Sequence, residues 1–239
     1  RLGGGDLNSL FGIAGFAGGI GFGTIFLKKG YSLQRTYALS KLESAMMPAI
    51  QVGLLVLVVT APAFIFFSQK GPGAMHAPWL ISLAAGLVVG GLSQFSRLCT
   101  VGGFRDLFLF KKSILIFGYL AVLIGVFVVN ISFGNFHLGF ENQPIAHTDG
   151  LWNFLGMALA GFCSVLLGGC PLRQLIMTGE GNSDSAVTVL GLGAGAAFAH
   201  NFGLAASGAG PTLNGEIAVG VGFVVALIIA VVNTKCANA

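Results

Sequence analysis

Two stretches of this sequence carry a cysteine close to glycine and arginine, and each stretch interrupts apolar surroundings. The first, 93–106, reads SQFSRLCTVGGFRD and contains Cys99, and the second, 168–182, reads GGCPLRQLIMTGEGN and contains Cys170. A thiol is soft and polarizable, and an arginine fork hydrogen-bonds well to an oxyanion. Together these residue types favour contact with a small anion that contains sulfur or selenium.

Pro171 indicates how the second thiol is held. Proline suits the first turn of a helix, where its missing N–H costs nothing, so Cys170 is expected at the N-terminal end of a short helix. The helix dipole attracts an anion to such an end. Each cysteine stretch is expected to lead into a short amphipathic piece, at Leu107–Phe110 and at Leu175–Met177.

The composition indicates that most of the chain is surrounded by lipid. Of the 239 residues, 55% are hydrophobic and only 8% are charged, whereas soluble domains usually carry about 25% charged residues. The 38 glycines agree with this, because glycine lets membrane helices approach closely. The net charge of +4 is spread over short loops, so we do not interpret it as affinity for nucleic acid.

The apolar runs predict an all-α bundle of about seven membrane-spanning helices, which form a single transmembrane domain over residues 1–239. The predicted spans are Gly12–Leu27, Ala45–Phe67, Trp79–Phe95, Ile114–Phe133, Trp152–Leu167, Val187–Ala206 and Ile217–Val232. The two cysteine stretches then form short broken or re-entrant helices inside the bundle. Such breaks are tolerated at membrane depth where they are buried or line a cavity.

The loop charges predict the orientation of the chain. Ten Lys and Arg residues fall on one side of a seven-span chain and two on the other, as the positive-inside rule requires for a first residue outside and a C-terminus inside. The ten are Lys28, Lys29, Arg35, Lys41, Arg97, Arg105, Lys111, Lys112, Arg173 and Lys235, and the two are Arg1 and Lys70. We expect a multi-pass protein of a bacterial or archaeal plasma (inner) membrane.

An internal repeat is consistent with this topology. Residues 3–24 align without gaps with residues 179–200, and in the predicted topology the two copies cross the membrane in opposite directions. Inverted repeats of this kind are typical of secondary transporters. The second copy follows the Cys170 stretch, so the repeat predicts a counterpart of Cys170 upstream of Arg1. The chain would then be the C-terminal part of a longer protein.

Several polar residues each leave two interpretations open. Arg97, Arg105 and Arg173 either anchor the chain at the inner membrane surface or bind an oxyanion. His200 and Asn201 end an apolar run. They either face a cavity, because polar groups at membrane depth are costly, or cap a helix near the outer surface.

The other two cysteines, Cys163 and Cys236, are expected to be small apolar packing residues. Cys163 precedes Cys170 by seven residues, which is about 10 Å along a helix and too far for a disulfide without a break. The sequence has no Cys-x-x-Cys pair and no Cys/His cluster, so we expect neither a metal nor a cofactor.

The sequence resembles the YeeE/YedE family of membrane proteins, and in particular its selenium-transporter branch. The resemblance extends from Arg1 to the last span and is carried by SRLCTVGGFRDLFLF (96–110), QPIAHTDGLWNFLGM (143–157), GGCPLRQLIMTGEGNSDSAVTVLG (168–191) and AFAHNFGLAAS (197–207). The sequence departs from the family at its N-terminus, because members carry further N-terminal helices with an additional GCPLR-like cysteine segment.

The resemblance implies an importer of small sulfur or selenium compounds, with thiosulfate as the substrate class of the best-understood relatives. In that family, cysteines on short helices line the pathway at an hourglass-like constriction. They contact the terminal sulfur of the anion through weak S–H···S contacts without covalent chemistry. Matched by motif, these positions are Cys99 and Cys170, whereas Cys163 matches no family cysteine. A cytoplasmic sulfur-carrier protein is a candidate recipient of the cargo.

We therefore expect a carrier, not an enzyme, for a thiosulfate-like anion or a selenium species. The residues expected along its pathway are Cys99, Cys170, Arg97, Arg105, Arg173, His200 and Asn201. Two alternatives stay open. One is a membrane thiol sulfurtransferase or oxidoreductase, and the other is a non-transporting subunit of a membrane complex.

Overall fold

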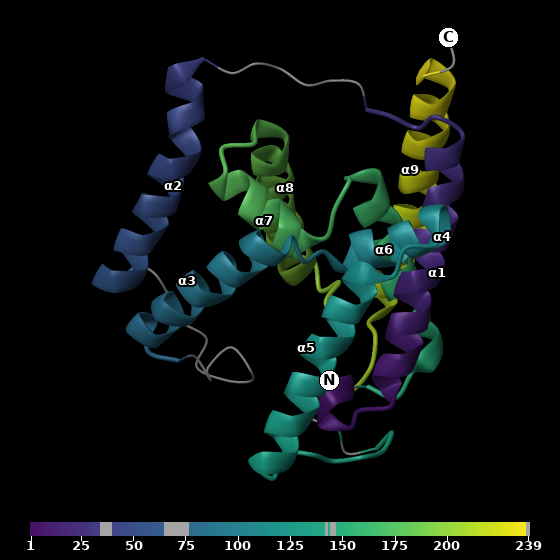
Figure 1. The fold of residues 1–239 in the computed structure, drawn as a ribbon, viewed down its shortest axis with the longest axis horizontal. Coiled ribbons are helices and arrows are strands. Elements are labelled where there is room, and N and C mark those ends of the chain that lie inside the picture. Colours follow the sequence, from purple (N-terminus) through teal and green to yellow (C-terminus); the bar gives the residue numbers. More distant parts are fainter. Residues whose placement is uncertain (34–39, 65–76, 142, 144–146, 238–239) are drawn as a thin grey trace. The chain divides into compact units, whose positions relative to one another are not determined.

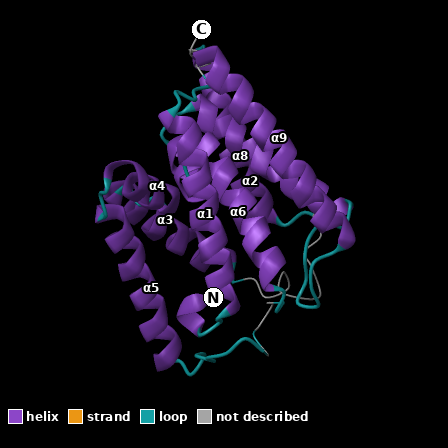
Figure 2. Ribbon diagram, turned by 90° about the vertical axis from the view of Figure 1, so that its right-hand side faces the viewer, coloured by secondary structure: helices purple, strands orange, loops and turns teal. Residues whose placement is uncertain are grey.

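The computed structural model describes residues 1–33, 40–64, 77–141, 143 and 147–237, and the elements named in these residues are all helices (Figure 2). They are η1 (Leu2–Gly4), α1 (Asn8–Lys28), α2 (Lys41–Thr60), α3 (Trp79–Ser96), α4 (Thr100–Phe110), α5 (Ile114–Ser132), α6 (Gly150–Leu166), α7 (Pro171–Gly179), α8 (Ser183–Asn201) and α9 (Leu213–Ala237). The all-α prediction is confirmed for the described part of the chain.

Each of the seven predicted spans overlaps a helix. In the described residues, five helical stretches are long and apolar enough to cross a membrane, namely α1, α3 with α4, α5, α6 with α7, and α9. The apolar part of α2 is shorter, Pro48–Thr60, and α8 is not among the five. Seven crossings therefore stay a prediction. Some residues used in the sequence-based predictions lie outside the described residues or side chains, namely Arg35, Lys41, Lys70, Lys235 and Cys236.

Both predicted breaks are present. α6 ends at Leu166, and α7 begins at Pro171, where proline chemistry predicted a helix start. α3 ends at Ser96, and α4 begins at Thr100, earlier than the amphipathic piece predicted at Leu107–Phe110. The start of α4 is set by local capping, whereas the prediction for this helix used only the apolar pattern further along the stretch.

The chain divides into two compact units, each described here by itself. Unit 1 comprises Arg1–Arg35, Leu98–Pro171 and Gly191–Ala239, and it contains α1, α4, α5, α6 and α9. Unit 2 comprises Thr36–Arg97 and Leu172–Leu190, and it contains α2, α3 and most of α7. Cys99 and Cys170 both belong to unit 1, so their surroundings are defined within a single unit.

The most extensive helix contact in unit 1 joins α1 and α6, which lie side by side (Figures 1 and 2). Two glycines of α1 face the backbone of α6. A Cβ at Gly15 would overlap the carbonyl oxygen of Phe154, and a Cβ at Gly19 would overlap that of Ala158. Glycine permits this approach because it has no side chain to separate the two backbones. The α1–α6 contact supports the helices that carry the candidate site.

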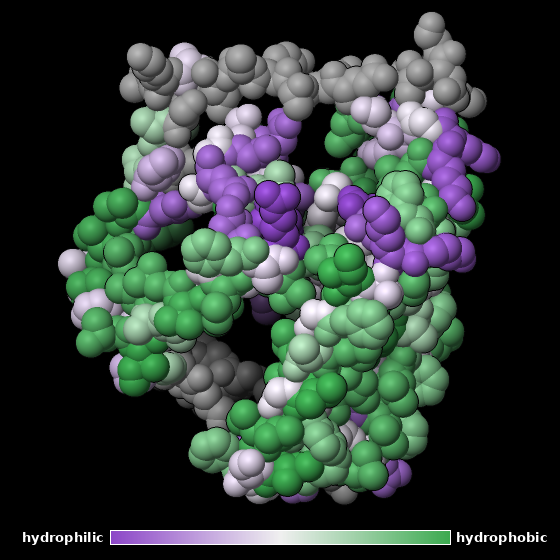
Figure 3. All heavy atoms as spheres, viewed as in Figure 1, coloured by the Kyte–Doolittle hydropathy of each residue, from purple (hydrophilic) through white to green (hydrophobic). Residues whose placement is uncertain are grey.

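α5 presents an apolar surface to its surroundings. None of its residues is buried, and its side chains that face the viewer in Figure 3 are almost all hydrophobic. Ile114 and Phe117 are 79% and 64% exposed. A helix that exposes so many large apolar side chains suits contact with lipid, where burial against water is not required.

Candidate functional site

The side chains of Cys99 and Cys170 meet inside unit 1. The Cys99 thiol lies close enough to interact with both the side chain and the backbone of Cys170, and the two residues belong to one buried cluster. Both residues are buried, at 9% and 5% exposure, and their sulfurs are not joined in a disulfide. The fold thus joins the two cysteine stretches that the sequence singled out.

Each thiol stands at the N-terminal end of a short helix. Cys99 is the N-cap of α4, where its extended backbone lets Sγ accept the backbone N–H of Gly102 at 3.2 Å. This bond satisfies one of the N–H groups that the first turn of a helix leaves without an intrahelical partner. Cys170 directly precedes Pro171, the first residue of α7, as proline chemistry predicts. Sequence reasoning missed the Gly102 contact, although a side-chain acceptor three residues before a free N–H is typical of an N-cap.

An apolar shell encloses the thiol pair. Ile20 of α1, Val101 of α4 and Val165 of α6 are buried with the two cysteines in one cluster. The partly buried side chains that pack against this cluster are Phe16, Leu27, Phe104 and Phe108. A polarizable sulfur or selenium atom gains dispersion contacts in such surroundings, whereas a strongly hydrated oxyanion loses water without equivalent replacement.

Arg173 is held by partners within unit 2. Its Nη1 donates to Oε1 of Gln94 at 2.9 Å, and its Nη2 forms an ion pair with Oε2 of Glu180 at 3.6 Å. The Gln94 amide in turn donates to the Glu180 carboxylate. The guanidinium therefore joins the end of α3 to the residue that follows α7, and the described contacts give it a structural role.

Replacement of Gln94 by alanine tests this role. We expect Gln94→Ala to lower the free energy of unfolding by about 1–2 kcal/mol, because the change removes a partner from both Arg173 and Glu180. Thermal unfolding in detergent measures the effect, and Gln51→Ala on α2 is the matched control because the Gln51 side chain is exposed. Equal melting temperatures for the two variants would contradict the structural role.

Among the described contacts, neither of the other two arginines meets the thiol cluster. Nη2 and Nε of Arg105 lie 2.9 and 3.0 Å from the same carboxylate oxygen of Asp106. Arg97 ends α3 in unit 2 with a left-handed backbone (φ 50°) and an exposed side chain. No described contact joins Arg97, Arg105 or Arg173 to a cysteine sulfur, so their role as oxyanion ligands stays a prediction.

His200 and Asn201 are the last two residues of α8, and both are exposed. The Asn201 amide donates to the carbonyl oxygen of Ala197 at 2.8 Å, one turn earlier. This bond holds the Asn201 amide against its own helix, and both interpretations left open by the sequence stay predictions. Neither residue belongs to the cluster around the thiols.

Cys163 occupies a different part of unit 1 from the thiol pair. It is half-buried against a second cluster, which includes Tyr31, Phe162 and Leu166. Its surroundings are those of a packing residue, as expected from the sequence. The pair that the fold assembles is Cys99 with Cys170, not Cys163 with Cys170.

The sequence profile of the sulphur transport family matches residues 95–236, a range that includes both thiols and both helix breaks. The chain belongs to the sulphur transport family. It is a multi-pass membrane protein of a family that transports sulfur compounds, and the resemblance to YeeE/YedE-type proteins is confirmed at this level. No curated protein and no solved structure gives a significant match to the chain.

Proposed function

We propose that this protein imports a small sulfur or selenium compound, a thiosulfate-like anion or a selenium species, along a pathway that passes between Cys99 and Cys170. The observation that carries the proposal is the contact of these two buried thiols at the N-terminal ends of α4 and α7. Membership of the sulphur transport family gives the class of cargo.

The chemistry of the pair suits transport better than tight binding. Two helix N-termini attract the negative charge of the anion, and broken helices with this arrangement are recurrent substrate sites in transporters. The thiols offer weak S–H donors and polarizable sulfur to the terminal sulfur or selenium atom. Because no covalent bond forms, the solute is released as readily as it is bound.

The setting of the pathway is part of the same proposal. We place the protein in a bacterial or archaeal plasma membrane, with its first residue outside and its C-terminus inside, on the basis of the loop charges. A cytoplasmic sulfur-carrier protein is the proposed recipient of the imported compound.

A membrane thiol oxidoreductase or sulfurtransferase is the second candidate function. The contact between Cys99 and Cys170 favours it, because such chemistry requires an attacking thiol and a resolving thiol close together. Mass spectrometry of the protein during turnover distinguishes the two. A persulfide or a Cys99–Cys170 disulfide that forms and decays at the rate of the reaction would replace the carrier proposal with the enzyme.

Uptake in a bacterial strain that lacks other sulfur and selenium importers tests the proposed function. We expect cells that express the protein to accumulate labelled thiosulfate or its selenium analogue selenosulfate, and excess unlabelled thiosulfate to compete while sulfate does not. Cells with an empty vector are the control. If none of these compounds accumulates in cells or in liposomes that contain the purified chain, the proposed cargo is wrong. Copurification of an obligate partner would then favour the non-transporting subunit.

A further inference from the structure

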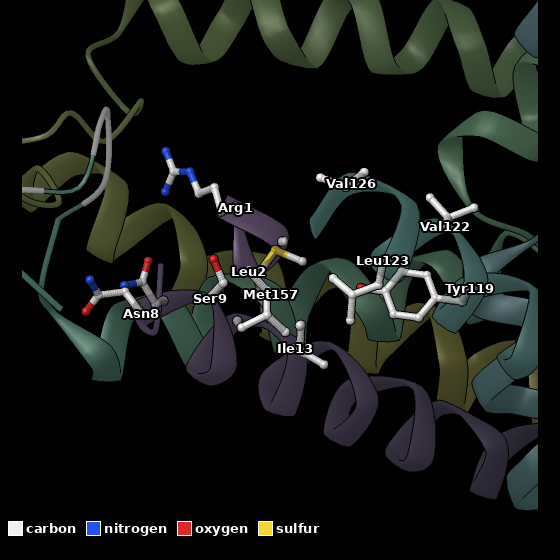
Figure 4. A pocket seen from close by; sticks show the side chains of 13 residues that line it. Arg1, Leu2, Asn8, Ser9, Ile13, Tyr119, Val122, Leu123, Val126 and Met157 are labelled. Atoms are coloured by element: carbon white, nitrogen blue, oxygen red, sulfur yellow. The ribbon is translucent and has the colours of Figure 1, made fainter. Parts of the chain in front are cut away.

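A cavity of about 490 Å³ lies between α1, α5 and α6 in unit 1. Figure 4 shows Arg1, Asn8 and Ser9 toward one end of this cavity and Tyr119 toward the other, with aliphatic side chains between them. Asn153 of α6 adds another polar group to the lining. The cavity has room for a small anion, with polar groups at the end that the predicted topology places outside.

Successive turns of α1 lead from this cavity toward the thiols. Ile13 lines the cavity, Phe16 follows about one turn later, and Ile20 belongs to the buried cluster that contains both cysteines. A helix rises 1.5 Å per residue, so Ile13 and Ile20 are about 10 Å apart along the axis. The layer of α1 between the cavity and the thiols is therefore the level of Phe16.

Phe104 occupies this layer together with Phe16. The ring of Phe104 contacts the ring of Phe16 edge to face, with the centroids 6.4 Å apart. It also contacts the ring of Tyr119, which lines the cavity, at 6.5 Å between centroids. Phe16 and Phe104 both pack against the cluster of the two thiols. Phe104 thus contacts both a residue that lines the cavity and the thiol cluster.

We infer that the sulfur compound binds in this cavity, on the outer side of the thiol pair, before it reaches the thiols, and that Phe104 is the gate between the cavity and the thiol pair. The inference rests on the proposed function, because it assumes that the thiols are the destination of the solute. An aromatic ring at a constriction excludes a hydrated anion because it offers nothing to replace the lost water. Phe104 is five residues after Cys99 on the chain. Because Phe104 lies on α4, a change of its side-chain rotamer opens the route while the contact between α1 and α6 stays intact.

Thiol labelling from outside the cell tests the gate. The background is Cys163→Ala with Cys236→Ala, which leaves the thiol pair as the only cysteines. A membrane-impermeant methanethiosulfonate that carries a sulfonate serves as the probe, because it is a small sulfur-containing anion. We expect Phe104→Ala to speed labelling of the pair by at least about tenfold, since the closed state loses the ring that maintains it. Tyr119→Ala, on a different helix, is expected to act in the same direction and serves if Phe104→Ala does not fold.

Phe108→Ala is the matched control for loosening of the site. Phe108 lies one turn further along α4 and packs against the same cluster, but its ring neighbour is Gly21 of α1 rather than the cavity wall. The inference predicts labelling within about twofold of the background for this variant. If the thiol pair is labelled no faster in Phe104→Ala and Tyr119→Ala than in Phe108→Ala, Phe104 is not a gate.

Uptake measured in parallel separates the gate from the proposed cargo. If uptake depends on both cysteines but labelling of the Phe104 and Tyr119 variants is unchanged, the proposed cargo is supported and the role of Phe104 as a gate is wrong. If these variants expose the thiols while no sulfur or selenium compound enters any strain, Phe104 controls access to the thiols and the proposed cargo is wrong.

Discussion

Cys99→Ala and Cys170→Ala are each expected to reduce uptake of the sulfur compound by about 100-fold or more. A site that is built around specific hydrogen-bond donors loses much more affinity when one donor is removed than it loses with an average contact. Each thiol is buried and lies against the other cysteine, so no neighbouring group takes its place. Initial rates of labelled thiosulfate uptake, normalised to the amount of protein in the membrane, measure the effect.

Two further substitutions give this prediction its controls. Cys163→Ala makes the same chemical change in the second cluster of unit 1 and is expected to leave uptake unchanged. Cys99→Ser retains an acceptor for the Gly102 N–H but replaces soft sulfur by oxygen. We expect it to preserve α4 and still lose uptake. Parental rates in both alanine variants would remove the cysteines from the pathway and refute the proposed mechanism.

The second large effect concerns the contact between α1 and α6. Gly19→Ala is expected to lower the free energy of unfolding by about 1–3 kcal/mol, because an added methyl group overpacks the interface. The new Cβ would overlap the carbonyl oxygen of Ala158, a backbone atom that cannot rotate away. The melting temperature of the purified protein in detergent, together with the fraction that elutes as a single folded species, measures this loss.

The neighbouring glycine is the control for Gly19. A Cβ at Gly18 would meet only the ring of Phe154, at 3.9 Å, which is ordinary van der Waals contact. We expect Gly18→Ala to melt at the parental temperature or slightly above it, since alanine favours the helix more than glycine. Similar melting temperatures for Gly18→Ala and Gly19→Ala would show that the close approach of α1 to α6 does not determine stability.

Apolar length and local chain chemistry made much of the fold predictable from the sequence. The seven predicted spans all overlap helices, because a membrane segment must satisfy its backbone hydrogen bonds internally. Pro171 predicted the start of α7, and the internal repeat has a parallel in the helices. α1 begins at Asn8 and α8 at Ser183, within one residue of the positions that the alignment of 3–24 with 179–200 pairs.

The sequence could not predict the environment of the polar side chains. An arginine side chain is long, and it pairs with whichever acceptor the fold brings near. Arg173 has two acceptors, Gln94 of α3 and Glu180, which follows α7. No local spacing in the sequence predicts that these two residues lie next to Arg173. The same is true of Phe16 and Phe104, which read as ordinary apolar residues until the fold places them beside the thiols.

The double role of the Cys99 sulfur has a consequence for movement within the protein. This one atom closes the first turn of α4 through the Gly102 N–H and also contacts Cys170. In the proposed pathway the anion accepts the S–H of Cys99, which polarises the sulfur and makes it a better acceptor for the Gly102 N–H. Arrival of the solute and closure of the first turn of α4 are therefore thermodynamically linked. Hydrogen exchange at the Gly102 amide would slow under transport, which makes this single backbone proton a reporter of solute passage through the membrane.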